Sequence, residues 1–269
     1  MSYQKVVPII LAGKRQDDPL SEHFQVENKA FIELKGKCLI DWVLNSIEGT
    51  QLSEPYLSIS EFQKELFEKK IQNHSYKFIL NNSNESPVLS CIKALDLIDE
   101  EKSLFITTAD NPLLTPQIIK YFLDNCEKEN ADLIIGVVNG QDRFNTNQVD
   151  NFSKLKRTWH KVNKSLWLSG ANLFYWSKKS LPNSLKQILI KLETQRKSPL
   201  AFSSTVAKID FIFLLKYFFQ LSSLKECERA LSKTIGIQVK LLILPFPEAC
   251  IDVDKISDYE LAKTLLRAD

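Results

Sequence analysis

Short apolar runs alternate with amphipathic stretches along the first half of the chain. Runs of aliphatic and β-branched residues predict buried strands, and apolar positions at helical spacing predict helices. The predicted strands are Val6–Leu11, Pro55–Ile59, Lys77–Leu80, Leu104–Thr108 and Leu133–Val138. The predicted helices are Leu39–Ser46, Glu61–Gln72, Pro87–Ile98 and Pro116–Glu129. This βαβ repetition predicts an α/β fold with a mainly parallel sheet flanked by helices.

Two of these helices carry a start signal in the sequence. Ser86 precedes Pro87, and Thr115 precedes Pro116, so each pair offers a capping hydroxyl followed by proline at the first helical position. Both helices then begin just beyond the carboxyl end of a strand. Open α/β sheets bind their ligands at that edge.

The second half of the chain is less regular. Gly140 to Leu168 is polar, basic and rich in Asn, which predicts an excursion from the sheet at about 140–170. A strand is expected at Ala171–Trp176, amphipathic helices to about Ser232, an apolar strand in "IQVKLLILPFP" and a final helix at Asp258–Arg267. There are no repeats or low-complexity tracts, so we expect one domain over residues 1–269.

Composition narrows the class of protein. The chain has 269 residues, 44% of them hydrophobic, with 35 Lys and Arg against 33 Asp and Glu. The net charge of +2 provides no global attraction to nucleic acid or to an anionic membrane. The cysteines are scattered and form no C-x-x-C pair, which is typical of a reducing compartment: Cys38, Cys91, Cys126, Cys227 and Cys250.

Membrane insertion and export are not indicated. The chain shows no leader-like pattern and no apolar segment of about 18 to 20 residues, so we expect a cytoplasmic protein. The most apolar stretch, Ile209 to Leu221, is interrupted by Asp210, Lys216 and Gln220. Its length is typical of a core helix or a partner-binding face.

The first candidate site is the loop after the first strand. In "IILAGKRQDD" the apolar run ends at Gly13 and is followed by Lys14 and Arg15. Backbone N–H groups together with cationic side chains can hold phosphates, and glycine allows close approach. Neither G-x-x-x-x-G-K-[ST] nor G-x-G-x-x-G occurs, which argues against P-loop and dinucleotide-binding proteins. Lys29 is a second cation near this end; a solvated turn is the alternative interpretation.

Carboxylates mark the second and third candidates. "LFITTADNPLLTP" delivers Asp110 to the carboxyl end of a strand, where it could bind Mg²⁺ or simply cap a turn. In "CIDVD" the side chains of Asp252 and Asp254 project to one side of an extended segment. Two such carboxylates repel unless a cation lies between them, although a solvated edge is the alternative. Ser257 offers a start for the final helix.

A basic cluster is the fourth candidate. "KLKRTWHKV" contains Lys156, Arg157, Trp159 and His160, and a guanidinium there could clamp a phosphate. Trp159 could cover a base or a sugar, whereas a charged surface strand is the alternative. With only three His, no H-E-x-x-H and no G-x-S-x-G, a His-rich metal site and a serine hydrolase are not indicated.

Six segments together resemble one family of enzymes. They are "IILAG", "NKAFIELKGKCLIDWVL", "SPVLSCIKAL", "FITTADNPLLT", "SGANLF" and "IDVDKISDYELA". The chain is similar, over nearly its whole length, to the nucleotidyltransferases of the molybdenum-cofactor guanylyltransferase-like group. It resembles a bacterial branch of this group more than the molybdopterin enzyme itself. The resemblance implies a Rossmann-like GT-A fold with a mainly parallel mixed sheet, and transfer of a nucleoside monophosphate from an NTP to a small phosphorylated acceptor.

The resemblance also implies site residues. Catalytic roles fall on Lys14, Arg15, Lys29 and Asp110, with Mg²⁺ held by Asp110 and by Asp252 or Asp254. The implied nucleotide-binding residues are Leu11, Ala12, Gly13, Lys14, Arg15, Lys29, Asn82, Ser86, Ser90 and Ala109. On the acceptor side we expect Lys156, Arg157, Trp159, His160, Gly170 and Asn172. Nucleic acid is not an expected partner, and a homodimer is left open.

One departure from the family pattern bears on activity. The usual opening is close to L-A-G-G-x-G-x-R, but here only Gly13 precedes Lys14 and Arg15. The phosphates would then be held more by side chains than by backbone N–H groups. Two alternatives therefore stay open beside the enzyme: a non-catalytic nucleotide-binding protein on the same fold, and a GT-A glycosyltransferase.

Overall fold

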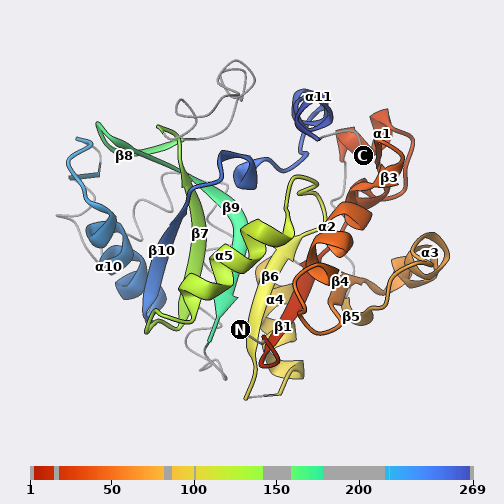
Figure 1. Cartoon of the computed structure of the whole chain (residues 1–269), viewed down its shortest axis with the longest axis horizontal. Helices are drawn as coiled ribbons and strands as arrows, with labels where there is room; N and C mark the ends of the chain where they lie inside the picture. The colour runs from red at the N-terminus through yellow and green to blue at the C-terminus, as the bar shows by residue number, and fades with distance from the viewer. Residues whose placement is uncertain are drawn as a thin grey trace.

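Seven strands lie side by side in the order β10-β7-β9-β6-β1-β4-β5, and β8 pairs with β9 to complete an eight-stranded sheet (Figure 1). The computed structural model describes residues 3–14, 18–81, 87–99, 101–141, 159–177, 216–217 and 219–266. The sheet strands are β1 Val6–Leu11, β4 Tyr56–Ser60, β5 Lys77–Asn81, β6 Ser103–Thr108, β7 Leu133–Asn139, β8 His160–Asn163, β9 Leu166–Trp176 and β10 Val239–Leu244. A small antiparallel ribbon adds β2 Glu33–Leu34 and β3 Lys37–Cys38.

Helices connect these strands. The α-helices are α1 Pro19–His23, α2 Leu39–Glu48, α3 Lys64–Lys70, α4 Pro87–Leu97, α5 Pro116–Cys126, α10 Leu224–Ile235 and α11 Ile256–Leu265. Within the described residues, short 3₁₀ turns are η1 Lys29–Phe31, η2 Glu61–Gln63 and η4 Pro247–Cys250. The predicted cap of α5 is present, since the Thr115 hydroxyl accepts from Ile118 N at 3.2 Å. Helix α4 likewise begins at Pro87.

The sheet is mixed and mostly parallel, as predicted. β6, β1, β4 and β5 run parallel, and β10 runs parallel to β7. β9 is antiparallel to both of its neighbours, β6 and β7. Its insertion reverses one strand within an otherwise parallel sheet, so the amino-terminal half of β9 lies at the edge where the parallel strands end.

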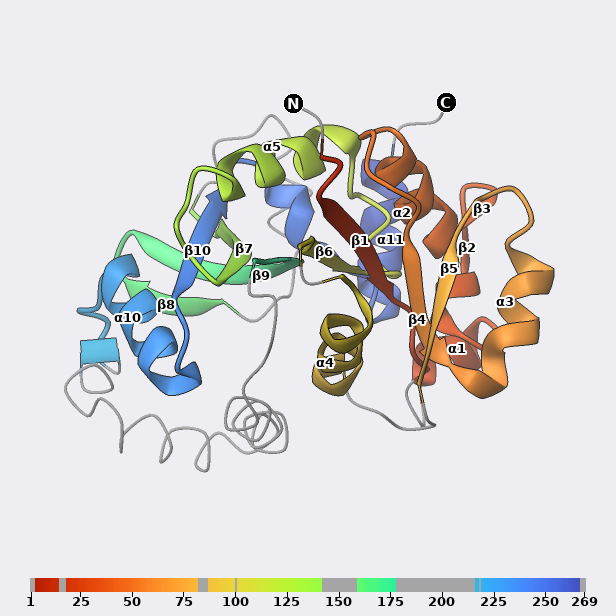
Figure 2. The same cartoon turned by 90° about the horizontal axis from the view of Figure 1, so that it is seen from below.

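Two apolar layers cover the faces of the sheet. Successive residues of β1 point to opposite faces, as Ile10 joins the core under α2 and α5 while Ile9 joins the core under α4 and α10. Figure 2 shows α2 and α5 on one side of the sheet and α4 and α10 on the other. Helix α11 lies beside α1 (Figure 1), where the rings of Tyr259 and Phe24 are 4.7 Å apart.

The structure corrects two helix predictions. Glu61–Gln72 is not one helix, because η2 precedes a shorter α3 that ends at Lys70. The final helix begins at Ile256 rather than at Asp258, and its N-cap residue is Lys255 instead of Ser257. The carboxylate of Asp258 is buried and accepts from Asp254 N at 3.3 Å, so the first turn of α11 contacts the segment that carries Asp254.

The expected excursion at 140–168 is partly wrong. Residues His160–Asn163 form β8, and Leu166 begins β9, so this part of the segment belongs to the sheet. Only Val162 is buried among the four residues of β8, and a single apolar position gives too weak an alternation to reveal a strand. Residues 142–158 lie outside the described part of the chain.

No helix in the described part of the chain is long and apolar enough to cross a membrane. The apolar stretch at Ile209–Leu221 lies mostly outside the described residues. At its end, Phe219 and Leu221 are exposed.

Candidate functional site

The candidate site residues lie at the topological switch point of the sheet, where the order in which strands are added changes sides. From β1 the chain crosses to β4 on one side, whereas from β6 it goes on to β7 on the other side. Such a reversal leaves a crevice at the carboxyl ends of the two central strands, the usual place for ligands in open α/β sheets. The corresponding position in this sheet is between the loop after β1 and the loop after β6.

The loop after β1 begins with backbone hydrogen bonds that extend the pairing of the sheet by one residue. Ala12 N donates to Ser58 O and Ala109 N donates to Leu11 O, both at 3.0 Å. Their two N–H groups are therefore used within the protein, which leaves Gly13 and Lys14, both exposed, as the described part of the loop that faces outward. No described atom lies within 4 Å of a Cβ built on Gly13, so there is open space beside it. Arg15 lies outside the described residues.

Asn28 joins this loop to the turn that carries Lys29. Its side chain is buried, and Nδ2 donates to Ala12 O at 3.0 Å and to Gln63 Oε1 at 3.1 Å. Its Oδ1 accepts from Ala30 N at 2.9 Å and so caps η1. One amide thus fixes the first loop and the Lys29 turn relative to each other.

Three carboxylates converge beside the Lys29 turn. Asp110, Asp252 and Asp254 each offer one ligand oxygen, and these atoms all lie within 4.8 Å of one another. Asp110 Oδ1 is buried and has no hydrogen-bond partner among the described residues. An acidic oxygen donor set with an unsatisfied buried oxygen fits a hard divalent cation such as Mg²⁺.

Backbone pairing brings these carboxylates together. Val253 N donates to Asp110 O at 2.8 Å, and Asn111 Nδ2 donates to Ala249 O at 3.0 Å. The segment after η4 therefore lies along the loop after β6. The backbone of Val253 pairs with Asp110 and its side chain is buried. Asp252 and Asp254, the residues before and after Val253, therefore both face Asp110.

Lys29 lies between two of the carboxylates. Its Nζ is 2.5 Å from Asp110 Oδ2 and 2.7 Å from Asp254 Oδ1, and its side chain is only 16% exposed. Burial acts to lower the pKa of Lys29, but the negative charges and hydrogen bonds of Asp110 and Asp254 outweigh it and raise the pKa above its usual value. Lys29 is therefore a fixed positive charge at this site.

Asn172 holds the third carboxylate. It lies in β9 where the pairing with β7 shifts register between Ile135 and Val137, and its φ of 53° is left-handed. Its Nδ2 donates to Asp252 Oδ2 at 3.0 Å. The residue expected on the acceptor side thus contacts the carboxylate cluster directly.

The strand β8 lies beyond the end of β6. Leu168 of β9 pairs with Asn139 of β7 on one side and with His160 of β8 on the other side. Further along β9, β6 takes the place of β8 on that second side. His160 and Trp159 are at the end of β8 nearer to Asn172, and Gly170 is exposed. The Trp159 ring packs on Gly140, whose added Cβ would lie 2.7 Å from Cε3. Lys156 and Arg157 lie outside the described residues.

The remaining expected residues are only partly described. Ser90 is buried in the first turns of α4. Asn82 and Ser86 lie outside the described residues. Ala109 is buried and closes the backbone link to Leu11 described above.

Sequence reasoning missed two structural amides. Asn28 and Asn111 each flank an expected site residue, and each uses its amide to join segments that are distant in the sequence. The only signal was their position, in "ENKA" and "ADNP", beside a cation and a carboxylate. Asparagine at a turn is common, so the pattern did not single them out.

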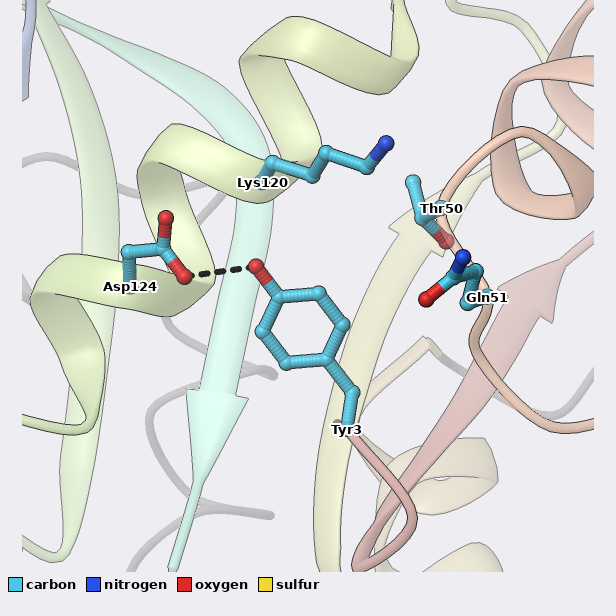
Figure 3. A pocket seen from close by; sticks show the side chains of 5 residues that line it. All are labelled: Tyr3, Thr50, Gln51, Lys120 and Asp124. Atoms are coloured by element: carbon cyan, nitrogen blue, oxygen red, sulfur yellow. Dashed lines mark hydrogen bonds between the residues drawn. The ribbon is translucent and has the colours of Figure 1, made fainter. Parts of the chain in front are cut away.

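A separate hollow lies at the opposite edge of the sheet. Tyr3, Thr50, Gln51, Lys120 and Asp124 line a cavity of about 450 Å³ (Figure 3). The Tyr3 hydroxyl donates to Asp124 Oδ1 at 2.6 Å. Burial, followed by this hydrogen bond and the charge of Asp124, raises the pKa of Tyr3 above its usual value. None of the expected site residues lines this cavity.

The fold and the site together define a class. A mostly parallel sheet with an acidic cluster at its switch point is an open α/β fold with its candidate site at the carboxyl ends of the strands. A family model described as the MobA-like NTP transferase domain matches residues 8–208. The chain belongs to this family, and it is a nucleotidyltransferase by its domain.

Solved structures share the fold. A hypothetical transferase from Thermus thermophilus has a TM-score of 0.76 at 23% identity, covering 95% of this chain and 99% of that one. A 4-diphosphocytidyl-2C-methyl-D-erythritol synthase from Anaerococcus prevotii has a TM-score of 0.52 at 12% identity, covering 97% and 95%. A CMP:2-keto-3-deoxy-manno-octonic acid synthetase complexed with CTP has a TM-score of 0.51 at 11% identity, covering 90% of each chain. No curated protein matches this sequence.

Proposed function

We propose that this protein transfers a nucleoside monophosphate from an NTP to a small phosphorylated acceptor in a Mg²⁺-dependent reaction that releases pyrophosphate. The observation that carries the proposal is the convergence of Asp110, Asp252 and Asp254 with Lys29 at the switch point beside the first loop. The membership in the MobA-like NTP transferase family supports it. Two neighbours in fold also have names that refer to cytidylyl transfer or to bound CTP.

The proposed roles follow from position and charge. Gly13, Lys14 and Lys29 bind the triphosphate, since the exposed end of the first loop and the Lys29 turn are joined by Asn28. Asp110, with Asp252 and Asp254, holds Mg²⁺. The bound ion supplies Lewis-acid stabilisation of the phosphate oxygens. Trp159, His160 and Gly170 lie toward the acceptor, at the end of β8.

The reaction needs orientation and charge stabilisation more than covalent help. An acceptor phosphate oxygen forms a bond to the α-phosphorus, and the bond from that phosphorus to the bridging oxygen breaks with release of pyrophosphate. Negative charge grows on the leaving pyrophosphate, where Lys14 and Lys29 stabilise it. No protein nucleophile is required.

Pyrophosphate release tests the proposal. The protein is incubated with each of the four ribonucleoside triphosphates, Mg²⁺ and a panel of sugar and polyol phosphates, and pyrophosphate is measured with a coupled assay. We expect release with at least one pair of substrates. Asp110→Asn should lower kcat by at least about a hundredfold, because it removes a ligand charge from a site that acts by electrostatics.

Asp124→Asn is the matched control. Asp124 accepts a hydrogen bond as part of the cavity at the opposite edge of the sheet, and it belongs to no proposed site. This variant should retain wild-type turnover. Absence of pyrophosphate release with every substrate pair, while a nucleotide still raises the melting temperature, would favour the non-catalytic nucleotide-binding protein.

A further inference from the structure

The ammonium group of Lys29 lies where a divalent cation would bind. Its Nζ contacts Asp110 Oδ2 at 2.5 Å and Asp254 Oδ1 at 2.7 Å, and the ligand oxygens of all three carboxylates lie within 4.8 Å of one another. Mg²⁺ binds oxygen at about 2.0–2.1 Å. An ion that bridges the same two oxygens would therefore nearly overlap the position of Nζ.

The two cations cannot occupy this position together. Like charges repel strongly at contact, and Lys29 and Asp110 are only 16% and 14% exposed, so water screens the repulsion poorly. Entry of a metal ion must move the ammonium off Asp110 and Asp254. Asp252 is less affected, because its Oδ2 is held by Asn172 rather than by Lys29.

The displaced ammonium has one evident new partner. Lys29 begins the η1 turn, and Asn28, immediately before it, is bonded to Ala12 of the first loop. The proposed triphosphate site begins at Gly13, the next residue. The turn that carries Lys29 is thus tied directly to the loop proposed to hold the phosphates.

We propose that Lys29 is an exchangeable counterion that keeps the metal site closed until a triphosphate is present. Without nucleotide it neutralises Asp110 and Asp254. With metal and triphosphate it exchanges these carboxylates for phosphate oxygens. This exchange couples the binding of the metal ion to the binding of the triphosphate, so each binds more tightly when the other is present. The inference rests on the metal and triphosphate roles proposed above.

The first experiment measures Mn²⁺ affinity without nucleotide, from the electron paramagnetic resonance signal of the free ion. Lys29→Met removes the charge and keeps the length of the side chain, so it should bind Mn²⁺ at least about tenfold more tightly than the wild type. Lys29→Arg retains a cation and should bind Mn²⁺ as weakly as the wild type. Equal or weaker binding by Lys29→Met would overturn the proposal.

The second experiment uses the wild-type chain and avoids any effect of substitution on folding. Lysine acetylation by an activated ester is followed by mass spectrometry, with Lys128, an exposed lysine outside the proposed site, as the internal reference. Mn²⁺ should raise the acetylation of Lys29 relative to Lys128 by about tenfold, and inorganic tripolyphosphate added with Mn²⁺ should reverse this increase. If Mn²⁺ leaves the acetylation rate of Lys29 unchanged, the ion does not displace the ammonium from the carboxylates. If the rate stays high after tripolyphosphate is added, the released ammonium does not bind phosphate. Either result contradicts the proposal.

These measurements are independent of turnover. Neither needs a nucleoside or an acceptor, so they can support the exchange even where no pyrophosphate is released. Asp110→Asn supplies the metal-site control, because in this variant Mn²⁺ should not change the acetylation of Lys29. If Mn²⁺ raises it equally in Asp110→Asn, the ion acts elsewhere and the proposal fails.

Discussion

Asn172 donates a hydrogen bond from Nδ2 to Oδ2 of Asp252 at 3.0 Å, from a left-handed backbone position in the middle of a strand. Such a conformation is uncommon for a residue other than glycine and occurs often at functional sites. The irregular pairing of β9 with β7 places Asn172 at the level of the loop after β6. The strand is thus distorted at the point where it meets the carboxylate cluster.

We predict that Asn172 orients Asp252 as a metal ligand. Asn172→Gly keeps the left-handed backbone and removes the amide, so the fold should persist while the metal concentration for half-maximal activity rises about 10- to 100-fold. Metal titrations of activity and of Mn²⁺ binding provide the measurement. A selective rise in KM for the phosphorylated acceptor, with metal binding unchanged, would instead assign Asn172 to the acceptor.

Asn28 should be important for stability. Asn28→Ala leaves the buried Ala12 carbonyl without this donor and removes the cap of η1, so we expect a loss of roughly 2 to 4 kcal/mol in the free energy of unfolding. Urea denaturation measures it. Asn45→Ala is the control, because Asn45 is an exposed helix residue, and it should change stability by less than about 0.5 kcal/mol.

Substitution of Gly13 can distinguish a role in binding from a role in folding. A Cβ built there meets no described atom within 4 Å, so Gly13→Ala should leave the melting temperature unchanged. If phosphates approach the backbone at Gly13, the added methyl group should raise KM for the NTP about tenfold or more. An unchanged KM would mean that the triphosphate does not contact this residue closely.

Gly140 and Gly170 form a matched pair in the same part of the sheet. A Cβ at Gly140 would lie 2.7 to 3.1 Å from atoms of the Trp159 ring, whereas one at Gly170 would meet nothing within 4 Å. Gly140→Ala should therefore destabilise the protein by about 1 to 3 kcal/mol through overpacking. Thermal unfolding should show no loss for Gly170→Ala, and a similar loss in both variants would contradict the packing of Trp159 on Gly140.

Glu226 should contribute a pH-dependent part of the stability. Hydrogen bonds from Lys216 and from Ser223 lower the pKa of Glu226 from 4.5 to about 2 in the folded chain. Because the folded pKa lies below the unfolded one, this stabilisation is complete above pH 4.5 and is lost as the pH falls toward 2. Lys216 Nζ is 2.5 Å from Glu226 Oε1, which makes the carboxylate charge the source of the effect.

Glu226→Gln isolates this charge, since a glutamine side chain can still accept from Ser223 N in the capping box. Urea midpoints of the two proteins should differ at pH 7 and converge as the pH falls below 4.5. A difference that stays constant across this range would show that the charge does not contribute.

Much of the candidate site could be predicted because its members end strands or flank helices. Asp110 follows β6 and Gly13 follows β1, and parallel strands bring their carboxyl ends to one edge. The pairing of β6 and β1 was not evident locally, but any α/β sheet would place both residues at that edge. Asp252 and Asp254 were identifiable as a pair on one side of an extended segment.

Other features depend on contacts between distant segments. The bond from Val253 to Asp110 joins residues far apart in the chain, and β8 carries too few apolar positions to reveal itself. Asn172 was expected to contact an acceptor, and its bond to Asp252 depends on the irregular pairing of β9. The position of Lys29 between two carboxylates likewise required the tertiary structure.

The amino-acid sequence by itself determined the class of fold, the chemistry available at the strand ends and the resemblance to nucleotidyltransferases, because periodicity and residue type are local properties. Only the tertiary structure decided which charges meet. Opposite charges stabilise each other over a few ångströms, and that distance is set by strand order and register rather than by spacing along the chain. The Lys29 ammonium between Asp110 and Asp254, with Asn172 on Asp252, is therefore a property of the folded sheet.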